Sequence, residues 1–174
     1  NLLNKGELFE LFWNRIGEER QELRLSSKTP YVFNSKFSPE VSFSIYQQDS
    51  TFINTNFHSR ISYHISPETQ LAISYHSESS ENLEQNMAEN LDTYNNSFIG
   101  LQFKYNIPKN DFFFNERLFI EISPSIGQRK IGQQLLNQFK IEATASYLWD
   151  INFRNSIYIK NKTFHLNSSS FLYN

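Results

Sequence analysis

The chain has 174 residues, the length of one domain, and a formal charge of -2 at pH 7, with no Cys. This charge gives no reason to expect nucleic acid as a partner, because nucleic-acid-binding domains carry a clear excess of Lys and Arg. The absence of Cys excludes a disulfide framework and a thiolate metal site. No segment approaches the roughly 20 consecutive apolar residues of a transmembrane helix, so a helical membrane protein is also excluded.

Mean hydropathy and aromatic content point in different directions. The mean hydropathy of -0.55 is typical of a water-soluble protein. Aromatic residues nevertheless make up 16% of the chain, with 17 Phe and 9 Tyr. A β-barrel in a membrane reconciles the two values, because lipid-facing and lumen-facing side chains alternate along every strand. Half of each strand can then be polar while the other half is strongly apolar.

Apolar and polar residues alternate along the whole chain, and this period of two predicts β-strands. The first runs lie at 9–14 and 23–33, and the second is long for a soluble strand but suits one that crosses a membrane. Seven more runs follow, the last of them less regular, at 41–46, 56–65, 70–76, 99–105, 118–126, 139–149 and 156–166. About nine strands at this spacing predict an all-β antiparallel meander.

The predicted connections between these runs alternate between two kinds. Short connections rich in turn residues are expected at 34–39, 66–68, 107–116 and 150–155. The connections between them are turns near 17–18 and 48–50, a long acidic stretch at 77–95 and a polar stretch at 127–134. Outer-membrane barrels have short periplasmic turns at one end and longer loops at the other. The order of the connections therefore favours a transmembrane β-barrel.

Charged and aromatic residues take different positions on the predicted strands. The charged residues that we predict to face the lumen are Arg24, Lys28, Arg60, Lys104, Glu121, Lys140 and Glu142. On the lipid side a charge would cost roughly 2 to 4 kcal/mol near the middle of the bilayer, so the lumen is the favourable place. The aromatic residues that we predict to form an interfacial girdle beside the short turns are Tyr31, Phe33, Tyr105, Tyr147 and Trp149.

The sequence contains no pattern that predicts an enzyme, a metal site or a cofactor site. Three of the four histidines, His58, His64 and His76, fall on the polar side of their strands. They lack a metal-ligand spacing such as His-Glu-x-x-His, so we expect ordinary polar residues of a lumen. The acidic cluster in 78–92 lacks the order of a calcium loop, which favours a solvated loop. The chain also has no nucleophile elbow and no Gly-rich phosphate loop.

Two strings of residues resemble a known family. One runs from Gln47 to Phe52 and precedes an alternating strand; the other runs from Ala145 to Trp149 and continues through Arg154–Ile159 to Leu166–Ser168. Together they resemble the barrel of the bacterial surface antigen family, which comprises outer-membrane protein assembly factors and their two-partner-secretion relatives. The versions from Bacteroidetes are the most similar in texture, and the resemblance spans nearly the whole chain.

The resemblance implies that residues 1–174 are a partial outer-membrane β-barrel segment, an incomplete set of about nine strands from a larger barrel with separate periplasmic domains. It implies a location in the bacterial outer membrane and a function in the insertion of outer-membrane proteins or in polypeptide secretion. The partners would be the lipid bilayer and a client polypeptide, with no cofactor. The family's diagnostic Arg-Gly-Phe element does not occur in this sequence, so no functional residue is carried over.

Two further interpretations stay open. A passive outer-membrane channel or small-molecule transporter would use the mixed charges of the lumen to conduct a solute. A soluble lipocalin-like barrel would bury the apolar side of the same strands in a core. In either membrane interpretation we expect the segment to fold poorly alone, because an open sheet leaves its edge strands unpaired and its apolar side uncovered.

Overall fold

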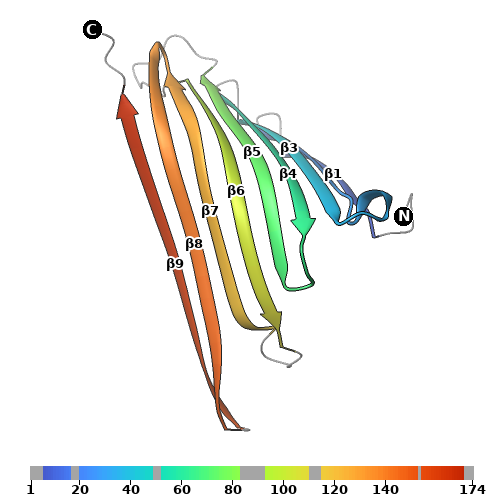
Figure 1. Cartoon of the computed structure of the whole chain (residues 1–174). Helices are drawn as coiled ribbons and strands as arrows, with labels where there is room; N and C mark the ends of the chain where they lie inside the picture. Colours follow the sequence, from blue (N-terminus) through green and yellow to red (C-terminus); the bar gives the residue numbers. More distant parts are fainter. Residues whose placement is uncertain are drawn as a thin grey trace.

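The computed structural model describes residues 6–16, 20–48, 52–82, 93–109, 115–152 and 154–170. These residues form one sheet in which each strand pairs antiparallel with the next along the chain (Figure 1). The strands are β1 (Leu8–Ile16), β2 (Arg20–Lys28), β3 (Phe37–Gln48), β4 (Phe52–His64), β5 (Thr69–Asn82), β6 (Tyr94–Pro108), β7 (Glu116–Ile131), β8 (Gln134–Asn152) and β9 (Asn155–Ser170). The prediction of an all-β antiparallel meander of about nine strands is therefore confirmed.

The sheet is a curved wall with two free edges. Its strands lengthen from 9 residues in β1 and β2 to 19 residues in β8 (Figure 1). The edges are β1 and β9, which do not pair with each other in the described part of the chain, so the sheet is open. In the described ranges no helix is long and apolar enough to cross a membrane.

The register divides the sheet into two faces, because residues directly opposite each other on paired strands share a face. The face that we call the polar face carries the row Arg60, Ser74, Gly100, Ser125 and Lys140. The opposite face, which we call the apolar face, carries the row Ile61, Ile73 and Leu101. Side chains alternate between the two faces along every strand.

The polar face is the more crowded of the two. The buried side chains of the described residues all lie on it: Ser38, Ser62, Ala72, Gln138, Ser146 and Leu148. Side chains crowd together on the inside of a bend and spread apart on the outside. The sheet therefore curls toward its polar face and presents the apolar face outward.

The second strand is shorter than the alternation predicted. The sequence favoured a strand over 23–33, but β2 ends at Lys28 and a short 3-10 turn, η1 (Val32–Asn34), follows. Pro30 has no N–H to give to a neighbouring strand, and Tyr31 and Phe33 both adopt a left-handed backbone with φ of 52°. Their predicted place at the end of a long strand was wrong.

Two of the predicted connections are partly strand. β5 continues through to Asn82 and β6 begins at Tyr94, so part of the expected acidic loop 77–95 is paired; residues 83–92 lie outside the described residues. β7 continues to Ile131, which reduces the expected polar stretch 127–134 to a turn at Gly132, whose φ is 56°. The predicted turns at 17–18 and 48–50 lie almost wholly outside the described residues.

Candidate membrane interface

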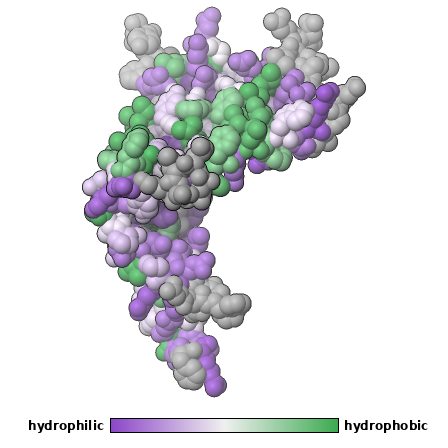
Figure 2. Space-filling view, turned by 90° about the vertical axis from the view of Figure 1, so that its right-hand side faces the viewer, coloured by the Kyte–Doolittle hydropathy of each residue, from purple (hydrophilic) through white to green (hydrophobic). Residues whose placement is uncertain are grey.

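A band of large, exposed hydrophobic side chains crosses the apolar face from β1 to β8. Members from seven strands are Trp13, Val41, Ile61, Ile73, Leu101, Ile126 and Trp149. In Figure 2 hydrophobic residues gather in a contiguous band with hydrophilic residues above and below it. A contiguous apolar surface of this extent is unusual on a soluble monomer and marks a surface that contacts protein or lipid.

The band has a limited height because the strands continue beyond it as polar sequence. On β5 the apolar-face positions pass from Tyr75 to Ser77 and Glu81, and on β7 they pass from Ile126 to Lys130. Both polar extensions lie at the end of the sheet that carries the turn at Gly132. The apolar band therefore occupies one level of the sheet, as expected of a surface fitted to a hydrocarbon layer.

The band weakens at the edge strand β9. Ile157 and Ile159 continue it on the apolar face, but Asn161 and Thr163, which lie opposite Ala145 and Ala143, do not. The Thr163 hydroxyl donates a hydrogen bond to the Asn161 side-chain oxygen at 2.9 Å. The sequence pattern of this last strand was the least regular of the nine, and the register gives the reason: its two faces do not separate polar from apolar residues.

The seven charged residues predicted to face a lumen share the polar face. The register of the paired strands places all seven there: Arg24, Lys28, Arg60, Lys104, Glu121, Lys140 and Glu142. Four of these seven take part in ion pairs: Arg24 with Glu22 at 2.7 Å, Arg60 with Glu40 at 2.5 Å, and Lys140 and Glu142 with each other at 2.9 Å. Their exposure to the water of a lumen remains a prediction.

A hollow of about 270 Å³ lies at the centre of the polar face. Its floor is made of small residues, Ser74, Gly100 and Ser125, which are consecutive Cα partners across β5, β6 and β7. Phe98 borders the hollow, and the Lys140 ammonium lies 5.3 Å from the centre of its ring. The alternation predicted the polar face but not this hollow, because its floor depends on the register of three strands.

The predicted girdle residues divide into two groups. Tyr147 and Trp149 are exposed on the apolar face of β8, and Tyr105 lies on the same face of β6. Tyr31 instead turns toward the polar face, where its ring lies 5.0 Å from that of His64. Phe33 is 90% exposed in the turn after β2. A girdle role stays a prediction for all five predicted residues, but the alternation placed Tyr31 on the wrong face.

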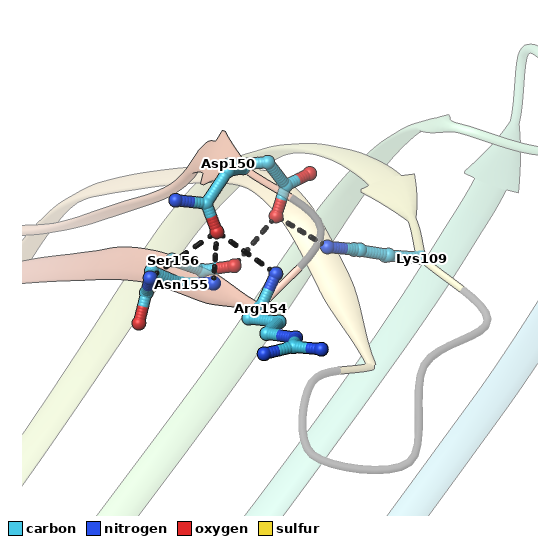
Figure 3. Close-up of polar contacts among 6 residues, drawn as sticks. Lys109, Asp150, Arg154, Asn155 and Ser156 are labelled. Carbon is cyan, nitrogen blue, oxygen red and sulfur yellow. Dashed lines mark hydrogen bonds and ion pairs between the residues drawn. The ribbon is translucent and has the colours of Figure 1, made fainter.

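A cluster of polar contacts joins two turns at the end of the sheet opposite Gly132 (Figure 3). Lys109, which follows β6, donates to the Asp150 carboxylate at 2.7 Å, and the Ser156 hydroxyl donates to the same oxygen at 2.7 Å. The backbone N–H groups of Arg154 and Asn155 both donate to the side-chain oxygen of Asn152, the last residue of β8, at 2.9 Å. The sequence predicted the turn but not its link to Lys109.

The Lys109 ammonium and the Ser156 hydroxyl hold the pKa of Asp150 below its ordinary value of 3.8, because both stabilise the carboxylate form. A lowered pKa means that this contribution is fully present above the ordinary value and is lost as the pH falls through the lower folded value. We expect Lys109→Gln to raise the pKa of Asp150, measured by carbon NMR of the carboxyl group. Lys36→Gln, at a different turn, is the control; equal titration curves in all three chains would contradict the link.

The acidic cluster of the sequence is only partly described. Glu78 and Glu81 lie in β5, and the other members, Glu84, Glu89 and Asp92, lie outside the described residues. The Tyr94 hydroxyl donates to the Glu78 carboxylate at 2.8 Å, which raises the pKa of Tyr94. Within the described ranges no group of three or more His, Asp or Glu side chains could hold a metal ion.

Comparison with protein-family profiles, with curated proteins and with solved structures finds no match for this chain. The class that the fold defines is an open, all-β antiparallel meander sheet.

Proposed function

We propose that this sheet is part of the wall of a β-barrel in a bacterial outer membrane, with the apolar face toward lipid and the polar face toward the lumen. The observation that carries the proposal is the division of the sheet into an exposed apolar band on the outside of its curve and a charged face on the inside. Closed barrels and helices are the structures that span a bilayer with every backbone group hydrogen bonded.

The free energy of hydrophobic burial supports lipid as the solvent of the apolar face. Ile73, Leu101 and Ile126 are each at least 60% exposed to water in the isolated sheet. Removing apolar surface from water is favourable by roughly 25 cal/mol per Å², so a band of such side chains stabilises insertion strongly. The charged residues of the opposite face would avoid the cost of contact with hydrocarbon.

The function that we propose for this barrel is the insertion of outer-membrane proteins or the secretion of a polypeptide. Its support is the resemblance of Ala145–Trp149 and the strings after it to the bacterial surface antigen family. A client polypeptide would be guided by non-covalent contacts, in keeping with a sequence that has no catalytic motif. Depletion of the protein in its own bacterium should lower the amount of folded outer-membrane proteins, or of one secreted polypeptide, before it affects solute uptake.

A passive channel or small-molecule transporter is the second candidate. The observation that favours it is the mixture of signs on the polar face, where paired residues such as Arg60 and Glu40 would line a conducting lumen. Depletion would then slow the uptake of a small solute while folded outer-membrane proteins stay at their normal level. The two outcomes of the same experiment separate the candidates.

The two tryptophans test the membrane interface directly. Trp13 is 67% exposed and Trp149 is 60% exposed, and both lie on the apolar face. We expect brominated lipid to quench their fluorescence when the full chain is folded in vesicles, because bromine on an acyl chain quenches only rings in contact with it. Water-soluble iodide should quench them weakly.

The control uses chains in which both native tryptophans are replaced by Phe. One chain then carries Ile122→Trp on the apolar face and the other carries Ser123→Trp, one residue later, on the polar face. Brominated lipid should quench the first and iodide the second. Quenching of both by iodide alone would contradict the membrane interface and favour a soluble barrel.

A further inference from the structure

His58 and His76 lie directly opposite each other on the polar face. They are Cα partners in the pairing of β4 with β5, and their ring centres are 6.2 Å apart. Their separation of 18 positions in the sequence forms no recognised ligand motif, so only the register of the hairpin brings the two imidazoles together.

Neither imidazole has a hydrogen bond or an ion pair with any other described side chain, although both are partly buried. His64, on the same face of β4, differs in this respect because its Nε2 atom lies 3.1 Å from the Ser38 hydroxyl oxygen. No nitrogen of His58 or His76 is among the buried side-chain atoms without a partner, so these nitrogens are open to solvent and available to a ligand.

The two rings are slightly farther apart than a metal chelate requires. With metal–nitrogen bonds of about 2.0 to 2.1 Å, two imidazoles on one ion have ring centres roughly 5 to 6 Å apart. The chelate requires a rotation about the side-chain torsions of His58 and His76 that points a nitrogen of each ring at one ion. Imidazole is a ligand for Cu, Ni and Zn, and Cu²⁺ binds such sites most tightly of the divalent ions of this series.

The surroundings leave room for the remaining ligands of an ion. Both histidines border the hollow of the polar face, whose volume of about 270 Å³ is enough for several water molecules. Arg60 also borders the hollow, and its charge is balanced by the ion pair with Glu40. No third protein ligand is needed when water completes the coordination.

We propose that His58 and His76 form a two-histidine site for a divalent transition-metal ion, with Cu²⁺ as the preferred ion and water as its other ligands. This site does not depend on the membrane function proposed above, since it requires only the β4–β5 hairpin. Its failure and the failure of the membrane interface are therefore measured separately.

The test is a titration of the full chain with Cu²⁺, in a solvent in which circular dichroism shows the sheet, followed by electron paramagnetic resonance. We expect one Cu²⁺ per chain with hyperfine coupling to two nitrogen nuclei. Loss of a second-shell partner alone costs about 10- to 100-fold in metal affinity, so His58→Ala or His76→Ala should lower the affinity by at least tenfold. His64→Ala should leave both affinity and spectrum unchanged.

Circular dichroism of each variant shows whether the sheet is retained. Wild-type affinity in His76→Ala with an intact sheet would overturn the proposal, and so would equal losses in His76→Ala and His64→Ala. Because a His58→Ala chain could lose the sheet, His58→Gln provides a second variant that keeps a polar side chain of similar size. Two-nitrogen coupling that survives in His58→Gln would also overturn the assignment.

Discussion

Leu101→Arg is expected to prevent stable insertion of the chain into lipid vesicles. Leu101 is 60% exposed at the centre of the apolar band, between Ile73 on β5 and the β7 side of the sheet. An Arg at the middle of the bilayer costs roughly 2 to 4 kcal/mol, and this change also removes an apolar side chain from the band. The measurement is the fraction of folded chain in vesicles as a function of guanidinium concentration.

Gln102→Arg is the matched control for this prediction. Gln102 is the next residue along β6 and lies on the polar face, where its side-chain oxygen is 3.4 Å from the Arg60 guanidinium. A second Arg there would be hydrated in a lumen and should change the guanidinium midpoint much less than Leu101→Arg. Equal effects at the two neighbouring positions would remove the main support for a lipid-facing apolar band.

Gly127→Ala is expected to destabilise the pairing of β6 with β7. A Cβ atom at this position would overlap the Ser97 carbonyl oxygen and lie 2.5 Å from the Phe98 ring. Overpacking of a well-packed site costs about 1 to 3 kcal/mol. The free energy of unfolding, measured with guanidinium in detergent micelles, should fall by this amount.

Two further chains separate the causes of this loss. Ser125→Ala, two residues earlier on the same face of β7, should have a small effect because it adds no atom. The double change Phe98→Ala and Gly127→Ala should not restore stability, because the closest atom to the new Cβ belongs to the backbone of Ser97. Full recovery in the double variant would assign the clash to the Phe98 ring alone.

The alternation of the sequence was sufficient to predict the class of fold and the two faces. It works because a sheet with one apolar face has apolar residues at every second position, as in Ile99, Leu101 and Phe103. The alternation failed to predict strands whose residues are polar on both faces. Ser77 to Asn82 and Gly127 to Lys130 are polar, yet they are strand because their backbone groups pair with neighbouring strands, which the side-chain pattern does not report.

The candidate sites depend on the register of the paired strands. This register could not be predicted from the side-chain pattern. The prediction of a long second strand ran through Pro30, although proline cannot donate to a neighbouring strand, and the breaker signal could have corrected it. No such signal exists for His58 opposite His76, or for Phe98 beside Gly127. A shift of one residue in either pairing would separate these side chains onto opposite faces.

The polar extension of β7 and β8 beyond the apolar band also has a practical consequence. This hairpin ends in a turn at Gly132. A Cβ atom added at Gly132 would have no other atom within 4 Å. A short epitope tag inserted after Gly132 would project beyond the sheet from a hairpin that backbone hydrogen bonds hold together. Antibody labelling of intact cells through such a tag would then report which end of the protein faces the outside medium.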